Sequence, residues 1–300
     1  MKQRKNPILF SIVIANYNYG RFLSDALESI IGQCEDDCVC TSVDGRNRLK
    51  LPSGELVEII VCDGASTDNS IDVIKQYANR ITWWCSEKDG GQSAAFNKGF
   101  AQARGRFLTW LNADDVFFPG ALMAVAHEIE QYPTCEWFVG STVWTDEHLR
   151  IKRVFCAHRF SFLRGYFATI SACGPSSFFT KRLLNAAGGI DETLHYTMDI
   201  DLWERFFRRC QAHYRRTRTN VWAYRVHEDS KLSGADVSTK EKALENRGKA
   251  HIEGIRMVQR YALVPTWFRP LILFLSFSMI DKAVVFLRTF QLKGRLVHEC

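Results

Sequence analysis

The sequence has no apolar run long enough to cross a membrane. Its longest uncharged stretch, from Leu271 to Ile280, falls well short of the roughly 20 residues that a spanning helix needs. Charged residues and a proline interrupt the surrounding apolar region. With Trp267, Phe268 and Arg288 at its flanks, we expect this region either to lie on a membrane surface or to pack as a terminal helix on its own domain or on a dimer partner.

A strong charge imbalance is also lacking. The formal net charge of +6 over 300 residues permits an anionic ligand or a lipid surface but is too weak to indicate nucleic acid as a partner. The basic stretch at 205–225 carries no helix-turn-helix signature, and its default interpretation is a solvated basic face. Attraction to anionic lipid head groups is the second interpretation.

Neither a secretory leader nor a complete zinc site is visible. The first apolar run continues directly into Asn16 without a small-residue cleavage site, which argues against a signal peptide. The ten cysteines are therefore expected to be reduced thiols in a cytoplasmic setting. Cys34, Cys38 and Cys40 lie close together in the sequence but have no His or fourth Cys nearby, so they make a poor zinc site.

The common glycine-rich nucleotide motifs are absent. No G-x-G-x-x-G follows the first strand-like run, and no G-x-x-x-x-G-K-S/T occurs anywhere, which counts against dinucleotide-binding and P-loop proteins. The first strand-like run is followed by NYNYGRF, with one glycine and one arginine. The basic, glycine-rich loop expected of a sugar-nucleotide pyrophosphorylase is therefore missing too.

What the first 120 residues do contain is a regular alternation of strand-like and helix-like segments. The overall composition, with 46% hydrophobic and 24% charged residues, is that of a folded protein. Buried strands are expected at 9–15, 56–63, 81–87 and 106–112, with apolar residues at helical spacing between them. This alternation predicts a parallel sheet covered by helices on both faces. The polar segment 32–55 is expected to be a surface insertion, and from about residue 159 we expect helices mixed with loops.

Polar side chains follow each of the four predicted strands. They are Asn16 and Asn18, then Asp63, then Glu87 and Asp89, and finally Asn112, Asp114 and Asp115. In an open parallel sheet, ligands bind beyond the carboxyl ends of the strands, so these side chains are expected to converge on one site. Carboxylate and amide oxygens suit a hard cation such as Mg²⁺ or Mn²⁺, which usually also binds substrate phosphates.

Five segments between about residues 10 and 235 resemble, in order, those of a known enzyme family. They are SIVIANYNYGRFLSDALESI, VEIIVCDGASTDNS, SEKDGGQSAAFNKGFAQARGRFLTWLNADD, AAGGIDETLHYTMDIDLWERF and YRVHEDSKLS. The pattern resembles the inverting nucleotide-sugar glycosyltransferases of family 2 of the bacterial polysaccharide or lipopolysaccharide type. The resemblance implies an α/β GT-A (Rossmann-like) fold at 1–235, with a mostly parallel central sheet flanked by helices. Its nucleotide-binding part would cover about 8–118 and its acceptor-side part about 119–235, followed by a C-terminal helical extension at 236–300.

The resemblance also implies roles on the donor side. Asp63 would hydrogen-bond the base, usually uracil, although a capping or turn carboxylate is the simpler interpretation. Asp89 with its glycines would approach the ribose and diphosphate, and Gln92 and Asn97 would reach toward the sugar. The full set of implied nucleotide and donor residues is Asn16, Tyr17, Asn18, Asp63, Asp89, Gly90, Gly91, Gln92, Asn97, Asn112, Ala113 and Lys231.

The segment NADD corresponds to the metal-binding D-x-D region of the family. Asp114 is the first candidate for direct coordination, with Asp115 adjacent to the metal or in its second coordination sphere and His227 contributing an imidazole. Many relatives have Asp where Asn112 stands, so the change removes a charge and weaker metal binding is one expected result. The alternative for Asp115 is a cap on the helix that begins near Pro119.

For catalysis, the resemblance assigns Asp199 as the general base that takes the proton from the acceptor hydroxyl. Asp201 would support the loop or the helix start, and an N-cap is the competing interpretation of Asp199. Ser176 and Ser177 lie in a segment that resembles the acceptor side of the family's site, and both are weak candidates.

The expected function is metal-assisted transfer of a sugar, with inversion, from a nucleotide-diphosphate sugar to a glycan or lipid-linked acceptor. A UDP-sugar is the favoured donor, and the inner face of the cytoplasmic membrane is the expected location. Peripheral membrane contact and a homodimer are compatible with this interpretation; a nucleic-acid partner is not expected. The alternatives are a non-catalytic relative that binds a glycan or a partner at the membrane and, less favoured, a sugar-nucleotide pyrophosphorylase.

Overall fold

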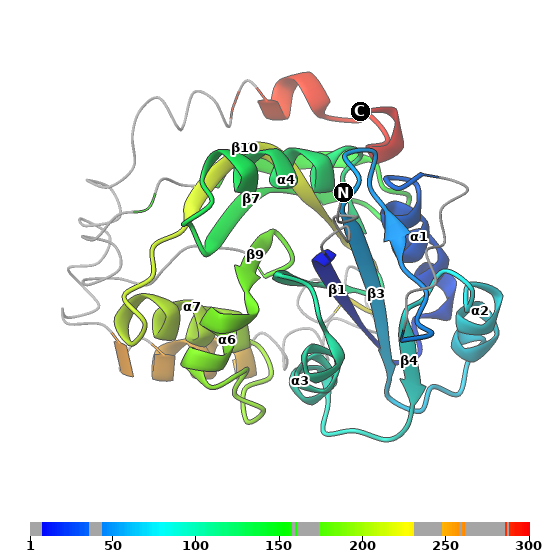
Figure 1. The fold of residues 1–300 in the computed structure, drawn as a ribbon, viewed down its shortest axis with the longest axis horizontal. Coiled ribbons are helices and arrows are strands. Elements are labelled where there is room, and N and C mark those ends of the chain that lie inside the picture. The colour runs from blue at the N-terminus through cyan, green and yellow to red at the C-terminus, as the bar shows by residue number, and fades with distance from the viewer. Residues whose placement is uncertain are drawn as a thin grey trace, which may run out of the picture.

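Four parallel strands form the first half of the central sheet. The computed structural model describes residues 8–35, 44–157, 160, 174–230, 248–257, 260–261, 286 and 288–300. Within them, β1 (Ile8–Asn16) pairs in parallel with both β3 (Leu56–Asp63) and β5 (Phe107–Asn112), and β4 (Trp83–Ser86) pairs in parallel with β3. The predicted parallel sheet is therefore confirmed for this half of the fold (Figure 1).

Helices cover both faces of these strands because apolar side chains along each strand point alternately to opposite faces. Ile12 and Ile14 of β1 pack with α1 (Gly20–Ile31) and α2 (Ser70–Gln76), whereas Val13 packs with α3 (Gln92–Gln102) on the other face. The predicted helices are thus present, and α3 begins two residues earlier than the expected AAFNKGFAQA segment.

The second half of the sheet is mixed. It contains β6 (Val116–Phe117), β7 (Trp137–Thr145), β8 (Ile151–Phe155), β9 (Ser177–Thr180) and β10 (Arg215–Arg225), with helices α4 (Ala121–Gln131), α6 (Lys181–Ala187) and α7 (Met198–Arg208). β9 joins the two halves by pairing antiparallel with both β5 and β7, while β7 and β10 are parallel. With β2 (Leu49–Lys50) at one end, the strand order is β2-β3-β1-β5-β9-β7-β10-β6, with β4 on β3 and β8 on β7.

The expectation of helices and loops after residue 159 missed two strands. β9 has four residues, which is too short for a periodic signal. β10 contains most of the basic stretch, and its polar residues hide an inward row that includes Thr217, Val221 and Ala223. The stretch is also not a freely solvated basic face, because Arg215 pairs with Glu128 and Arg225 with Asp25.

The second part of the 32–55 insertion covers the sheet instead of forming a loose surface loop. β2 (Leu49–Lys50) pairs antiparallel with the start of β3, and Leu49 and Leu51 are fully buried. Arg48 is also buried and binds Glu58 inside the sheet. Cys34 donates to the carbonyl of Ile30, while Cys38 and Cys40 lie outside the described residues.

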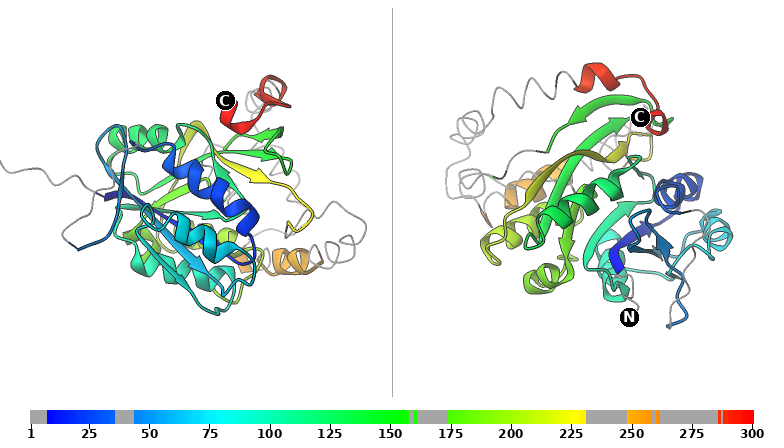
Figure 2. Two further views of the ribbon diagram at one scale, coloured as in Figure 1. Left: turned by 90° about the vertical axis from the view of Figure 1, so that its right-hand side faces the viewer. Right: turned by 45° about the horizontal axis from the view of Figure 1, so that its top comes forward.

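The described parts of the C-terminal region contact the main fold. Residues 248–257 are helical and lie beside α7, and residues 288–300 run along β8 (Figures 1 and 2). Ile151 donates its N–H to the carbonyl of Arg295 and accepts one from Gly294. None of the helices in the described part of the chain has the length and apolarity that crossing a bilayer takes. The apolar run at 271–280 lies outside the described residues.

An aromatic stack fixes α7 against the sheet. Trp203 of α7 lies between Trp110 of β5 and Trp137 of β7, with ring centroids 5.6 and 5.1 Å away. The Trp203 and Trp110 rings are nearly parallel, at 7°. Large aromatic side chains bury more apolar area than any others, so this stack sets the position of α7 and of the residues at its start.

A buried ion pair provides a test of how the insertion is anchored. Arg48 is 2% exposed and Glu58 is 0% exposed, so Arg48→Met leaves a buried carboxylate without its cation. We expect this variant to lower the free energy of unfolding by about 3–5 kcal/mol, measured by urea denaturation. Adding Glu58→Gln should recover most of the loss, because the unpaired charge is then gone.

The matched control is Lys152→Met, which breaks the exposed ion pair between Lys152 and Asp146. Such pairs contribute at most about 1 kcal/mol. Equal losses in Arg48→Met and Lys152→Met would show that the buried pair does not anchor the insertion.

Candidate functional site

Asp63 stands at the end of β3, directly beside Asn16 at the end of β1. It accepts hydrogen bonds from Asn16 Nδ2 (2.7 Å), from Ser66 N (3.0 Å) and Oγ (2.5 Å), and from Ser86 Oγ (2.6 Å). Burial alone would raise the pKa of Asp63, but these hydrogen bonds outweigh it and lower the pKa below its ordinary value. Asp63 therefore organises the turn after β3 as a fully engaged carboxylate.

Asp63 does not cap α2. The N-cap residue of that helix is Asn69, which makes no capping hydrogen bond with its side chain. Asp68 accepts from the N–H of Ser70 instead. Since all four donors to Asp63 come from the protein, direct contact between Asp63 and a base requires one of them to move.

Asn16 offers an acceptor that Asp63 lacks. Its side-chain oxygen is buried and has no hydrogen-bond partner among the described residues, which is costly unless a ligand supplies a donor. The neighbouring Tyr17 ring is 60% exposed. A buried acceptor beside an exposed aromatic ring is suited to a planar ligand that carries an N–H group.

A narrow cradle lies next to Tyr17. A Cβ atom on Gly64 would come within 3.3 Å of the Tyr17 ring and 3.4 Å of Asp89 Oδ2, so glycine keeps these two side chains close together. Asp89 Oδ1 accepts from the N–H of Gly91, and Asp89 Oδ2 has no hydrogen bond within the described parts of the chain. This oxygen is available to a ligand hydroxyl. Gly91 has φ +106°, which L side chains rarely adopt.

Asn18 has a local structural task. It adopts φ 58°, and its side-chain oxygen accepts from the N–H of Thr67 while its own N–H donates to Ser66 Oγ. Ala65 has φ 63°. Such left-handed residues cost free energy and are concentrated at functional sites. Asn18 thus joins the loops that follow β1 and β3.

A chain of hydrogen bonds occupies the segment that follows β5. The oxygen of Asn112 accepts from Gln92 Nε2 (2.8 Å), and Asn112 Nδ2 donates to Asp115 Oδ2 (2.7 Å). Asp115 Oδ1 accepts from the N–H of Arg225 (2.8 Å), and Asp115 is completely buried. Burial and the adjacent charge of Asp114 raise the pKa of Asp115 well above its ordinary value.

These contacts exclude one interpretation of Asp115. It does not cap α4, whose N-cap residue is Gly120 and which has no side-chain cap. Each of its oxygens accepts one N–H group, and these contacts are compatible with the predicted place of Asp115 beside the metal. The structure therefore gives Asp115 the task of tying β5 to β10. Ala113, which follows Asn112 in the sequence, is also buried.

Asp114 and His227 form the part of the site that is suited to a cation. Asp114 Oδ2 lies 3.1 Å from His227 Nε2. The imidazole is 2% exposed and packs against Phe22 and Tyr19, with ring centroids 4.6 and 5.7 Å away. Arg21, which pairs with Asp229 at 2.8 Å, lies 3.5 Å from the other imidazole nitrogen.

No cluster of three or more His, Cys, Asp or Glu side chains in the described ranges is arranged to hold a metal ion by itself. One carboxylate and one imidazole nevertheless fit a divalent ion whose remaining ligands are water and substrate phosphates. Asp114 and His227 meet that requirement. Lys231, the remaining predicted donor residue on this side, lies outside the described residues.

Asp199 is the second residue of α7 and is half-buried. Its Oδ1 atom accepts the N–H of Ile200, and the N-cap position belongs to Thr197, so Asp199 is not the cap. Asp201 is fully buried and accepts from Tyr261 Oη (2.6 Å) and Arg205 Nε (2.7 Å). The predicted supporting role of Asp201 agrees with these contacts.

Three further predicted site residues, Asn97, Ser176 and Ser177, are hydrogen-bonded or buried within the fold. The Asn97 amide exchanges two hydrogen bonds with the backbone of Ile190, so it holds the loop before α7 instead of projecting freely toward a ligand. Ser176 and Ser177 are completely buried.

The sequence did not point to Gly64 or Ser86, whose positions in a turn and at a strand end carry no distinctive pattern.

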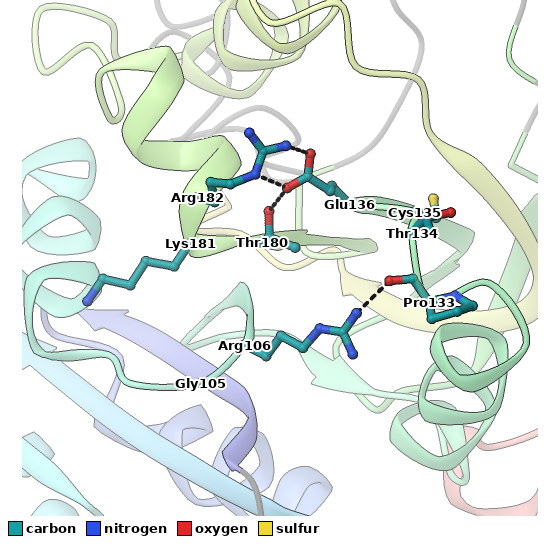
Figure 3. A pocket seen from close by; sticks show the side chains of 9 residues that line it. All are labelled: Gly105, Arg106, Pro133, Thr134, Cys135, Glu136, Thr180, Lys181 and Arg182. Carbon is teal, nitrogen blue, oxygen red and sulfur yellow. Dashed lines mark hydrogen bonds and ion pairs between the residues drawn. The ribbon is translucent and has the colours of Figure 1, made fainter.

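Two hollows lie at the opposite edge of the sheet. They have volumes of about 520 and 510 Å³ and share Thr134 and Cys135. In the first, Glu136 accepts from Arg182 Nε and Thr180 Oγ1, and Arg106 donates to the carbonyl of Pro133 (Figure 3). Neither hollow contains a predicted site residue.

Comparison with protein families gives a match over more than half of the chain. Residues 11–186 match the family model described as glycosyl transferase family 2. An uncharacterized glycosyltransferase from a Nostoc species is 36% identical over 118 residues, covering 38% of this chain and 31% of the relative. One from Rickettsia typhi is 26% identical, covering 71% of this chain and 63% of the relative. The chain thus spans between about a third and two thirds of the length of these relatives.

Solved structures resemble the fold. Staphylococcus aureus TarS residues 1–349, in complex with UDP-GlcNAc, aligns with a TM-score of 0.54 and 14% identity, covering 88% of this chain and 78% of that chain. The mannosyltransferase PcManGT from Pyrobaculum calidifontis, in complex with GDP-Man and Mn²⁺, aligns with a TM-score of 0.54 and 15% identity. That alignment covers 95% of this chain and 72% of the other. At these identities the likeness is one of fold, and it agrees with the predicted GT-A class.

The hydrogen bond from Asn112 to Asp115 generates a prediction about Asn112. Asn112→Asp removes the N–H donor and places a second carboxylate against Asp115. In buffer with a metal chelator at pH 7, we expect the free energy of unfolding to fall by at least about 2 kcal/mol. The measurement is urea denaturation, with Asn79→Asp at an exposed turn position as the matched control. If both variants lose the same stability, Asn112 does not stabilise Asp115.

Proposed function

Because the chain belongs to glycosyl transferase family 2, we propose that it transfers a sugar, with inversion, from a nucleotide-diphosphate sugar to an acceptor hydroxyl. The observation that carries this proposal is the division of one sheet edge into two chemically distinct ends. Within the described part of the chain, Asn16 has an acceptor without a partner, Tyr17 has an exposed ring and Asp89 has an available carboxylate oxygen. Asp114 and His227 present a carboxylate and an imidazole in contact.

The first end is suited to the nucleoside of the donor. The base would stack on Tyr17 and donate an N–H to the buried oxygen of Asn16, and the ribose would hydrogen-bond Asp89. A UDP-sugar is our favoured donor because the uracil ring carries one such N–H group. Guanine also has N–H donors, so the structure of this pocket is compatible with a GDP-sugar, and the experiment below separates the two.

The second end is suited to the diphosphate. Asp114 and His227 would hold a divalent metal, Mg²⁺ or Mn²⁺, which supplies positive charge to the diphosphate as it leaves. Gln92 stands beside Asn112 at the start of α3, where it would bind the sugar or the adjacent phosphate. Lys231, which lies outside the described residues, would supply a further positive charge to the diphosphate.

Asp199 would be the general base. In an inverting transfer the acceptor oxygen attacks the anomeric carbon from the side opposite the diphosphate, and the carboxylate takes the proton of that hydroxyl. The glycosidic bond forms as the bond to the diphosphate breaks, so the nucleoside diphosphate and the new glycoside are the two products. The half-buried position of Asp199 at the start of α7 is compatible with this role.

We further propose a glycan or lipid-linked acceptor, met at the inner face of the cytoplasmic membrane during polysaccharide or lipopolysaccharide assembly. Phe286 and Phe290 are 70% and 78% exposed and lie one helical turn apart, next to Arg288. Exposed aromatic residues with a neighbouring cation favour contact with a membrane surface. The same residues are also compatible with a homodimer contact.

Nucleotide binding is the first prediction from this proposal. At 100-fold excess over its Kd, the nucleoside diphosphate of the true donor should stabilise the full-length chain by about 2.7 kcal/mol. We expect a rise in melting temperature with uridine diphosphate and Mn²⁺ that is lost in Asp114→Ala and retained in the exposed control Asp72→Ala. A rise with guanosine diphosphate alone would change the donor. A rise with nucleoside triphosphates alone would favour a pyrophosphorylase.

Transfer chemistry is the second prediction. Asp199→Asn keeps the size of the side chain but removes the base, so kcat should fall by about 10²–10⁴-fold. Uridine diphosphate should still raise the melting temperature of this variant. The assay follows release of the nucleoside diphosphate with an acceptor present. Undiminished turnover in Asp199→Asn would exclude it as the base, and a wild-type chain that binds the nucleotide but never transfers would indicate a non-catalytic relative.

A further inference from the structure

The segment that leads into α7 is held by a carboxylate from much later in the chain. Glu253 accepts hydrogen bonds from three successive backbone N–H groups, those of His195 (3.0 Å), Tyr196 (2.7 Å) and Thr197 (2.7 Å). It also accepts from the hydroxyl of Thr197 (2.9 Å). Four donors on one carboxylate fix the path of the backbone immediately before Asp199.

This contact replaces local capping. Thr197 occupies the N-cap position of α7, yet its side chain makes no capping hydrogen bond within the helix. Its hydroxyl donates to Glu253 instead. The start of α7 therefore depends on the segment at 248–257 for its geometry.

The other side of the same loop is held by α3. Ser93 Oγ donates to the carbonyl of Leu194 (2.8 Å), and Asn97 binds both backbone groups of Ile190. The loop from 190 to 197 is thus fixed at one side by the helix that begins at Gln92. Glu253 completes this arrangement from the other side, at the end nearest to Asp199.

A second contact fixes residues 260–261 to α7. Tyr261 Oη donates to Asp201 Oδ1 (2.6 Å), and Arg260 lies 3.4 Å from the same carboxylate. Asp201 is completely buried and is two residues after Asp199. The described part of the region at 248–261 therefore makes contacts both before and after Asp199 in the sequence. Glu253 binds residues 195–197, and Tyr261 binds Asp201.

The charge state of Glu253 supports a persistent contact. Burial would raise its pKa, but the hydrogen bonds from His195, Tyr196 and Thr197 outweigh burial and lower the pKa below its ordinary value. A carboxylate with a lowered pKa contributes stability above its unfolded-state pKa, and this contribution is lost as the pH falls through the folded-state value. Glu253 is therefore ionised wherever the enzyme would act near neutral pH.

We propose that Glu253 is a positioning residue for the proton-accepting step: it holds residues 195–197, and through them Asp199, in the geometry that proton transfer needs. The proposal rests on the proposed function and extends it to a residue outside the region that matches the family model. It also makes the segment at 248–261 part of the catalytic architecture and not only of a C-terminal extension. Glu253 itself does not touch substrate.

The test uses Glu253→Gln in the full-length chain, which keeps the side-chain size but replaces one acceptor oxygen by a donor. Misplacing a reacting group by about 1 Å costs on the order of 100-fold in rate, so kcat should fall by about 10- to 100-fold. The donor KM and the melting shift with uridine diphosphate should stay unchanged, because the nucleotide end of the site has no contact with Glu253. A general loss of structure would instead impair both.

Hydrogen exchange provides the structural readout. The amides of 195–197 should exchange faster in Glu253→Gln than in the wild type, while those of β1 and β3 remain protected. The matched control is Glu130→Gln, at an exposed position of α4, which should change neither turnover nor exchange. Tyr261→Phe removes the one hydroxyl that donates to Asp201. It should produce a smaller fall in kcat, again with an unchanged donor KM.

The outcomes separate the proposal from the proposed function. Faster exchange at 195–197 with a reduced kcat and an unchanged donor KM supports the positioning role. Full turnover in Glu253→Gln, or unchanged exchange at these amides, overturns it while leaving the transferase assignment intact. Absence of transfer by the wild type with every donor tested overturns the proposed function itself, and the positioning role with it.

Discussion

The stacking of Trp203 between Trp110 and Trp137 is the interaction on which the arrangement of the site depends. Trp110 belongs to β5, which ends at Asn112, and Trp203 belongs to α7, which begins beside Asp199. One packing contact thus joins the strand that leads to Asp114 and the helix that carries Asp199. Because aromatic stacks gain their stability from area and from ring orientation, a shift of α7 along the sheet would cost contacts with both neighbours.

The crowding of carboxylates after β5 is tolerated because each has a different partner. Asp114 meets His227, while Asp115 receives N–H groups from Asn112 and from the backbone of Arg225. Buried carboxylates are costly unless they are paired or hydrogen-bonded, and both aspartates meet that requirement. The amide of Asn112 has a structural role of its own: it donates to Asp115, which a carboxylate at that position does only when protonated.

Local patterns predicted the parallel half of the fold well. The run LVEIIVCD coincides with β3, and the apolar spacing after Gly20 coincides with α1, because burial on fixed faces imposes these periods. The polar ends of the strands also converge as expected. The donors to Asp63 from Asn16 and Ser86 and the contact of Glu253 with 195–197 were not predictable, because they join segments distant in the sequence. β10 was missed because its basic residues obscure the alternation of its inward-facing side chains.

Three indole rings that lie 5.1 and 5.6 Å apart at their centroids also behave as one optical unit. At such separations the electronic transitions of neighbouring chromophores couple, and the coupled bands depend on the distance and tilt between the rings. The circular dichroism of this protein in the ultraviolet therefore carries a component that reports how α7 lies on the sheet. The docking of the helix that begins at the candidate base can thus be followed spectroscopically in the native chain, without an added label.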